Sequence, residues 1–470
     1  MTKIVPISIT IEFGKMQREV ISIDLETDQF GVSMKKVLDQ IQKKLGTGAI
    51  KYLDDEYREH EGKGLKILGT EKRQVTTVAG SLTYRRRTYR NPEGGRFAPV
   101  DQILGFEPYH HRDKHLQELN CALAGRSNYR ETAAISTLIT QNYISPSTIS
   151  RDVQRIGHQL SESDKNFYSE TEGTISSAVL YGESDGIFVR LQKDKAGKKS
   201  AEIRAAITYT GKKWISGNRM RLLNKMTLTA MDVTSLHWQE MIRNHMFSKY
   251  DLSHVKLMAV GGDGGSWVGS SFDLCGVNMI ERVLDPFHVK RAVRSAFSDV
   301  LDLNDFYEKL FSEGFDAVSL TLKPLLNKGK PSVRKARHEC FRYLQNHADE
   351  LLPLTCRSLP FDNLRSMGCM ESNIGKAIAL RMKTRGCSWS RLGAESMSSI
   401  LCHLPDLDNH SFNYLDFKNR RISVFPTHGR LKPAGQPRIQ QASFPIVSSG
   451  KVSEPYYKLF KGIICPQELL

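Results

Sequence analysis

Residues 175–192 read ISSAVLYGESDGIFVRLQ, and residues 255–265 read VKLMAVGGDGG. Both stretches combine an apolar run with turn-forming residues, a pattern typical of buried strands and their ends. We interpret Ser184-Asp185-Gly186 as a hairpin turn inside the first stretch. The expected strands cover residues 175–181, 186–192, 201–209, 255–260 and 279–284.

The chain after these strands is expected to be helical. Residues 286–350 are predominantly of helical character, and a further helix is expected at residues 370–382. Strands first, then a block of helices, then one more helix is the order of a mixed sheet with a helical insertion. The fold class is therefore a multidomain α/β protein.

Acidic residues stand where two of the strands meet glycine. Asp185 precedes Gly186, and Asp263 lies within a run of glycines, which let a bulky ligand approach a carboxylate closely. Two such carboxylates in one sheet, with Glu371 from the last helix, suit a pair of Mg²⁺ ions about 3.5–4 Å apart, because hard cations take oxygen ligands. The alternative is that each Asp-Gly pair is an ordinary turn.

A further cluster, Asp285-Pro286-Phe287-His288, lies at an expected strand-to-helix junction. Asp285 is suited to cap the helix, and His288 to orient a neighbouring group or contact a phosphate. The alternative is a capped helix with a structural histidine.

Residues 128–158 have the proportions of a helix-turn-helix. A first helix at 129–141 leads through a short turn to Ser145, a good N-cap, and Pro146, which fits the first helical position. The second helix presents a short polar and basic set of the kind that enters a DNA groove. That set is Ser147, Thr148, Ser150, Arg151, Gln154 and Arg155. Many small helix pairs bind no DNA, so the alternative is a purely structural pair.

A second basic element is expected between residues 74 and 89 as a β-hairpin. Its second strand carries Arg85, Arg86 and Arg87 between Tyr84 and Tyr89. Guanidinium groups interleaved with aromatic rings suit phosphate contact and stacking. The alternative is a solvated edge that charge protects from aggregation.

The composition favours a polyanionic partner. The 470 residues include 67 Lys and Arg against 51 Asp and Glu, a formal net charge of +16, which points to nucleic acid. Eight cysteines without a C-x-x-C pair predict reduced thiols. No signal peptide or membrane-spanning stretch is recognisable, so we expect a cytoplasmic protein without a membrane partner.

Taken together, these blocks resemble the ISLre-type bacterial insertion-sequence transposases over about residues 64 to 403. The resemblance implies an RNase H-like catalytic core with a DDE triad that cuts and joins DNA using Mg²⁺. By position it implies that Asp185, Asp263 and Glu371 are the metal-binding acids and that Asp285 and His288 belong to an accessory motif. The blocks are YRRRTY (84–89), STISR (147–151), ESDG (183–186), GDGGSW (262–267), LDPFH (284–288), and MESN (370–373) through to WS (389–390).

The sequence thus predicts a DNA transposase that uses Mg²⁺, with Mn²⁺ as a substitute, on double-stranded DNA at element ends and target. We expect a homo-oligomer when it is bound to DNA, in the bacterial cytoplasm with the nucleoid. The alternatives are a non-catalytic helix-turn-helix regulator or decayed transposase, and a structure-specific nuclease with the same core. The expected domains are 1–63 (strand and charged helix), 64–110 (basic hairpin), 111–160 (helix-turn-helix), 161–285 with 371–403 (catalytic core), 286–370 (helical insertion) and 404–470 (basic arm).

Overall fold

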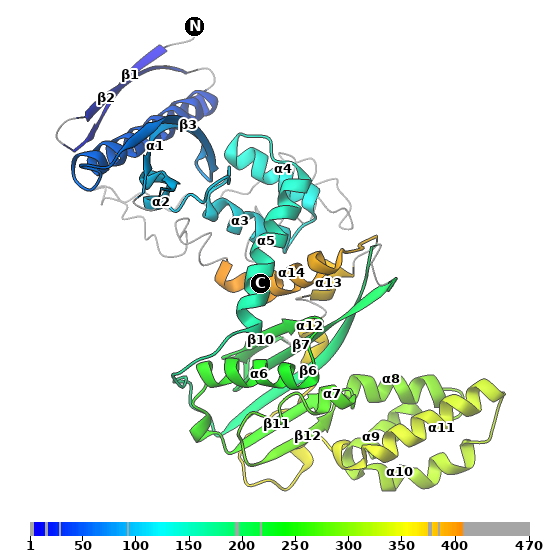
Figure 1. Ribbon diagram of the computed structural model, residues 1–470. Helices are drawn as coiled ribbons and strands as arrows, with labels where there is room; N and C mark the ends of the chain where they lie inside the picture. Colours follow the sequence, from blue (N-terminus) through cyan, green and yellow to red (C-terminus); the bar gives the residue numbers. More distant parts are fainter. Residues whose placement is uncertain are drawn as a thin grey trace, which may run out of the picture. The chain divides into compact units, whose positions relative to one another are not determined.

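A computed structural model describes most of the chain up to residue 407 (Figure 1). The described ranges are 4–14, 17–27, 30–91, 94–192, 197–216, 219–374, 378–383 and 386–407. The expected basic arm therefore lies, from residue 408 onward, outside the described residues. Within the described part, no helix is both long and apolar enough to cross a membrane.

A mixed five-stranded sheet, in the order β10-β7-β6-β11-β12, is the largest sheet in the described part of the chain. On one side β6 pairs antiparallel with β7, and β7 antiparallel with β10; on the other, β11 runs parallel to both β6 and β12. The chain is thus an α/β protein with a mixed sheet, as predicted. The strands are β6 (Val179–Arg190), β7 (Ser200–Tyr209), β10 (Met226–Ala230), β11 (Leu257–Gly262) and β12 (Ile280–Leu284).

The hairpin expected at Ser184-Asp185-Gly186 is wrong, because β6 runs through this triplet as one strand. Its pairing with β7 is continuous from Tyr181 opposite Tyr209 to Arg190 opposite Ser200. The parallel pairing with β11 ends at Glu183, so the antiparallel pairing with β7 keeps the backbone extended at this triplet. This tertiary pairing overrides the local turn preference. Asp185 is therefore held inside a central strand and not on a turn.

Helices cover both faces of this sheet. Tyr181 and Ile187 face a core shared with α5 and α14 (Arg391–Cys402), whereas Leu180 faces a second core with Trp238 of α6. The side chains alternate between the two faces with the period of two that a strand imposes. The elements that complete this part are α6 (Ser235–Lys249), α7 (Ser266–Gly269), α12 (Met370–Ile374), α13 (Leu380–Met382), and a hairpin of β8 (Gly211–Ser216) and β9 (Arg219–Leu223).

The segment expected as a helical insertion is largely helical and has its own apolar core. Arg337 is fully buried there, and its guanidinium donates two hydrogen bonds of 2.7 Å to Asp299 and one of 3.0 Å to the Ala296 carbonyl. Its helices are α8 (Pro286–Phe297), α9 (Leu303–Glu313), α10 (Phe315–Leu322) and α11 (Pro331–Asn346). Short 3-10 turns lie at Leu252–His254, Lys323–Leu325, Ala348–Glu350 and Leu354–Cys356.

The two helices of the expected helix-turn-helix also form where predicted. Ser145 caps α5, its hydroxyl accepting from the Thr148 amide at 3.2 Å, and Ile149 and Val153 are fully buried. The polar stretch from 161 onward was expected to be a linker, but α5 continues to Lys165 because Ser161 and Asp164 pack against neighbouring elements. The elements before β6 are β1 (Ile4–Phe13), β2 (Gln17–Glu26), α1 (Phe30–Glu59), β3 (Ile67–Thr77), β4 (Gly80–Arg90), β5 (Arg96–Phe97), α2 (Pro99–Ile103), α3 (Lys114–Ala124), α4 (Tyr129–Thr140) and α5 (Pro146–Lys165).

Candidate metal centre

Three aspartates come from the three neighbouring strands β6, β11 and β12. Asp185 lies on β6, Asp263 directly follows β11, and Asp285 directly follows β12. β11 runs parallel to β6 and β12, and its pairing with β6 ends at Glu183 opposite Gly261, so Asp185 and Asp263 each lie two residues beyond this last pair. The Asp285 amide donates to the Gly262 carbonyl at 2.8 Å, which fixes the ends of β11 and β12 together.

The loop that carries Asp263 is shaped by its glycines. Gly264 has a φ of +87°, and a Cβ there would lie 2.8 Å from His347 Nε2. Only glycine adopts this backbone without strain. The loop is held further by the Gly265 amide, which donates to Asp263 Oδ1 at 2.8 Å, and by the Tyr343 hydroxyl, which donates to the Asp263 carbonyl at 2.9 Å.

Glu371 reaches the same edge from α12. One ligand atom of each of Asp185, His288 and Glu371 lies within 4.8 Å of the other two. His288 Nε2 is 3.8 Å from Asp185 Oδ2. Asp285 caps α8 by accepting from the Phe287 amide at 2.9 Å, and this cap sets the helix turn that points His288 inward. The structure therefore gathers residues from four separate stretches of sequence.

The electrostatics of this cluster leave negative charge uncompensated. Contact with Asp185 raises the pKa of His288, and the charges of the other two aspartates act in the same direction. Burial raises the pKa of Asp285, and the charges of Asp185 and Asp263 add to this shift. Among the described residues, no lysine or arginine pairs with any of the four carboxylates. Carboxylate oxygens in excess over cationic groups are a donor set that fits a hard divalent cation.

Comparison with known proteins places the chain in a family. The model of the "Uncharacterised protein family (UPF0236)" matches residues 25–406. The chain belongs to the UPF0236 family. A UPF0236 protein of Streptococcus gallolyticus, named for the vanSb 3′ region, is 25% identical over 72% of this chain and 74% of its own length. Two from Caldanaerobacter subterraneus are 20% and 21% identical, over 84% and 81% of this chain and 81% and 80% of theirs. A structure of NurA with manganese matches 58% of this chain and 67% of its own at 11% identity and a TM-score of 0.10, too weak a likeness to carry an argument.

Sequence reasoning missed Glu183, a buried acid of this UPF0236 chain. Glu183 is 1% exposed and lies two residues before Asp185, so both side chains point to the same face of β6. Its Oε2 accepts from the amides of Gly368 (3.2 Å) and Met370 (2.9 Å), and its Oε1 from the Tyr209 hydroxyl (2.7 Å). Burial raises the pKa of Glu183, and these donors oppose that shift. The spacing of two from Asp185 was the available signal.

The arginines expected to contact DNA from the basic hairpin differ in their surroundings. Arg86 pairs with Asp101 and lies 3.4 Å from Glu71, and Arg87 contacts Asp54 at 2.9 Å and Asp55 at 2.7 Å. Arg85 is exposed and has no recorded partner among the described residues. Among the described residues, Arg86 and Arg87 are thus paired with acids and Arg85 is not.

The residues expected to read DNA from α5 are also unequal. Ser147 and Arg151 are exposed, whereas Thr148, Ser150 and Gln154 are half-buried. Arg155 is held by Glu107 at 2.9 Å and by the side chain of Gln117. The exposed part of the predicted set is therefore the amino-terminal half of α5.

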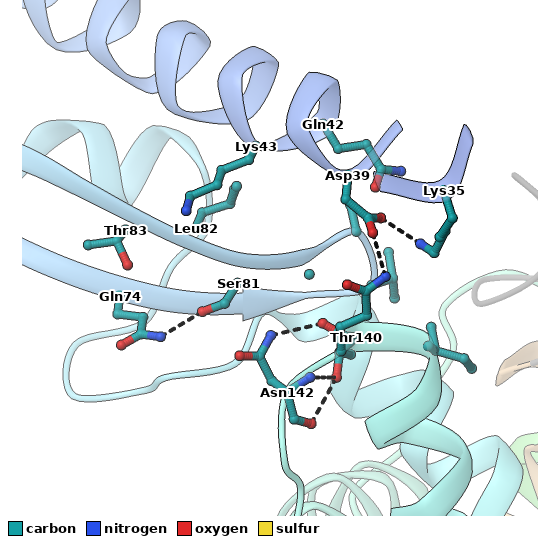
Figure 2. A pocket seen from close by; sticks show the side chains of 15 residues that line it. Lys35, Asp39, Gln42, Lys43, Gln74, Ser81, Leu82, Thr83, Thr140 and Asn142 are labelled. Carbon is teal, nitrogen blue, oxygen red and sulfur yellow. Dashed lines mark hydrogen bonds and ion pairs between the residues drawn. The ribbon is translucent and has the colours of Figure 1, made fainter. Parts of the chain in front are cut away.

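Figure 2 shows a separate polar cleft of about 410 Å³, lined by α1, the β3–β4 turn and the end of α4. Its one acid, Asp39, accepts from Lys35 at 2.6 Å and from Gln141 at 2.7 Å, so these polar groups satisfy one another. None of the predicted site residues lines this cleft. The chemistry of the described residues concentrates at the sheet edge.

Proposed function

We propose that this UPF0236 protein is a DNA transposase of a bacterial insertion sequence, cutting and joining DNA with Mg²⁺ held by Asp185, Asp263 and Glu371. The observation that carries the proposal is the convergence at one sheet edge of acids that 78 and 108 residues separate along the chain. Asp185 and Glu371 lie in one cluster with His288, and the charges of Asp185 and Asp263 both act on Asp285 and His288. Turn residues with no shared role have no reason to meet in this way.

The sheet arrangement supports an RNase H-like core. In that fold a central first strand belongs to an antiparallel meander of three strands and runs parallel to the two strands that follow. The order β10-β7-β6-β11-β12, with its strand directions, has this arrangement. The helical insertion between β12 and α12 accounts for the long gap before Glu371.

A relative's name adds independent support. The name of one Caldanaerobacter protein joins eleven locus labels with slashes. Many labels for one protein are what a gene copied to many positions of a chromosome would produce, as a mobile element does. The net charge of +16 fits a protein that holds DNA, in the bacterial cytoplasm and as an oligomer when two element ends are paired.

We assign different roles to the residues of the site. When bound, Mg²⁺ would stabilise the attacking and leaving oxygens of phosphoryl transfer. Asp185 and Asp263 are fixed by strands and backbone hydrogen bonds, so they would bind with little rearrangement. Contact with Asp185 raises the pKa of His288, so His288 would hold that carboxylate and offer a positive group to a DNA phosphate.

Nicking and strand transfer on plasmid DNA test the proposal. Asp263→Asn removes the charge but keeps an oxygen that accepts from the Gly265 amide, so we expect folding and DNA binding to persist while Mg²⁺-dependent nicking and joining vanish. Asp316→Asn, at an exposed position on α10, is the matched control and should retain both activities.

The outcomes separate the alternatives. Cutting without joining, with authentic element ends supplied, would indicate a nuclease. DNA binding with no metal-dependent reaction on those ends would indicate a regulator or a decayed copy. Full activity in well-folded Asp263→Asn would remove the assignment of this acid.

A further inference from the structure

The β8–β9 hairpin carries charge of one sign and contacts the segment that contains Glu371. Residues 211–225 contain five basic residues and no acidic one. No acid occurs anywhere between Glu202 and Asp232. The basic residues are Lys212, Lys213, Arg219, Arg221 and Lys225.

One face of the hairpin carries two like charges directly opposite each other. Lys213 pairs with Arg221 across the two strands, and both are exposed. No ion pair to either is recorded among the described residues. Like charges on opposing positions destabilise a strand pair, so this rung weakens the isolated hairpin. A polyanion bound to this face would relieve the repulsion.

The opposite face carries an exposed aromatic ring. Trp214 is 59% exposed and pairs with Met220, which is 48% exposed. The other three tryptophans, Trp238, Trp267 and Trp389, are buried or half-buried. A large ring held open to solvent suits stacking on a nucleic-acid base, and the cations of the opposite face lie one residue away along each strand.

The base of the hairpin is attached to the segment that carries Glu371. The Lys212 ammonium donates to the Ser366 carbonyl, and the Lys225 ammonium donates to Asn373 Oδ1 at 3.2 Å. Leu222, on the same face as Trp214, packs against the core that includes Met370. Lys212 and Leu222 thus form the pair that contacts the Glu371 segment. On the same face of the hairpin, Trp214 and Met220 form the next pair toward its tip.

We propose that the β8–β9 hairpin binds a DNA strand beside the metal centre, with Lys213 and Arg221 on phosphates and Trp214 stacked on an unpaired base. This inference rests on the proposed function, because it names how that site would hold its substrate. A second copy of the chain fits less well, since it would bring five like charges against five. The hairpin thus adds a DNA contact that the helix-turn-helix and the arginine strand do not supply.

Binding of the full chain to oligothymidylate, and to a duplex with a 3′ single-stranded overhang, tests this without any cleavage. In EDTA at low salt, tryptophan emission of the wild type should be quenched on binding, because Trp214 is the exposed tryptophan. Trp214→Ala should lose the quenching and bind roughly 5- to 100-fold more weakly. Trp214→Phe keeps a stacking ring, so it should lose the quenching but keep most of the affinity.

The phosphate contacts have their own readout. Lys213→Gln and Arg221→Gln should each reduce the slope of log affinity against log salt by about 0.7 for a single strand. Lys309→Gln, an exposed lysine on α9 of the helical insertion, is the matched control and should leave the slope unchanged. Melting temperatures near that of the wild type would show that all variants fold.

The DNA-binding measurements test the role of the hairpin independently of DNA cutting and joining. Loss of quenching and affinity in Trp214→Ala supports the inference even if the wild type proves unable to cut DNA, which would remove only the proposed function. Unchanged DNA affinity in Trp214→Ala overturns the inference, and so does a wild type that binds neither DNA. A dimer that Trp214→Ala converts to monomer without loss of DNA affinity would identify the face as an interface between copies and also overturn it.

Discussion

At the scale of single residues, Glu183 is a buried carboxylate that accepts hydrogen bonds from neighbouring segments at the candidate metal centre. Its two oxygens accept from three donors, and two of these are backbone amides in the segment that leads to Glu371. A glutamine in this place would direct an amide N–H at one of those donors, leaving it without an acceptor in a buried site. We infer that Glu183 is a positioning residue, which sets where Glu371 stands relative to Asp185.

Glu183→Gln should weaken Mn²⁺ binding by about 10- to 100-fold, the usual cost of losing a residue that orients a metal ligand. Affinity for DNA in EDTA should not change, because no DNA contact is altered. Tyr209→Phe is the matched variant: it removes only the hydroxyl donor and leaves both amides paired, so its loss should be smaller. Equal Mn²⁺ affinity in wild type and a folded Glu183→Gln would contradict the positioning role.

At the scale of elements, a buried charged cluster joins the end of α5 to α6 and to the end of α14. Asp164 is 6% exposed and lies 3.0 Å from His403 and 3.5 Å from His245. Burial opposes the charge on His403, but the hydrogen bond and charge of Asp164 outweigh it and raise the pKa of His403. Burial likewise opposes the charge on Asp164, and the two histidines still lower its pKa.

The two shifts define a pH window for stability. A raised histidine pKa stabilises the fold fully below the ordinary value of 6.5 and loses this effect as the pH rises through the folded-state pKa. A lowered aspartate pKa stabilises the fold above 3.8 and loses this effect as the pH falls through the folded-state pKa. His403→Gln should therefore reduce the free energy of unfolding by about 1–3 kcal/mol near pH 5.5 and by less near pH 8.5, measured by urea denaturation.

An exposed histidine of the same kind provides the comparison. His254 lies 2.6 Å from Asp251, but its side chain is 67% exposed, and exposed ion pairs contribute little. His254→Gln should change stability slightly and equally at both pH values. A loss of stability in His403→Gln that did not depend on pH would show that the packing of the imidazole, and not its charge, stabilises the contact between α5 and α14.

At the scale of the whole molecule, the candidate metal-binding acids would connect folding to metal binding. Asp185, Asp263 and Glu371 lie in distant parts of the sequence, and the fold brings Asp185 and Glu371 into one cluster and Asp263 to the same sheet edge. Ions that bind the folded chain alone stabilise it, by about 2.7 kcal/mol at a concentration of 100 times Kd. Mg²⁺ or Mn²⁺ should therefore raise the melting temperature of the wild type.

Asp263→Asn separates this effect from general salt effects. Without metal the variant should melt at or above the temperature of the wild type, because one of several like charges is gone. With metal it should gain little, whereas Asp316→Asn should gain as much as the wild type. Differential scanning calorimetry measures these melting temperatures. An equal rise on adding metal in Asp263→Asn and wild type would show that the ions bind elsewhere.

Local sequence was enough to predict features that depend on neighbours in the chain. The Ser145 cap with Ile149 and Val153 on the inner face of α5, the apolar run of β11, and the helical insertion all follow from patterns a few residues long. Asp185 and Asp263 could be named as candidates because glycine and strand patterns mark their surroundings, and Glu371 because it begins an expected helix and lies in a block of the family resemblance. That they lie together was beyond such patterns, since long-range pairing brings them there.

The sequence alone determined the α/β class, the order of its elements and the basic character of the chain, because periodicity and charge are local or summed properties. Only the tertiary structure decided that Ser184-Asp185-Gly186 continues a strand, that Arg86 and Arg87 are paired with acids, and that Glu183 holds the Glu371 segment. In each case the partner is 15 or more residues away in sequence. A residue's local preference is then outweighed by backbone pairing, burial and charge that exist only once the chain has folded.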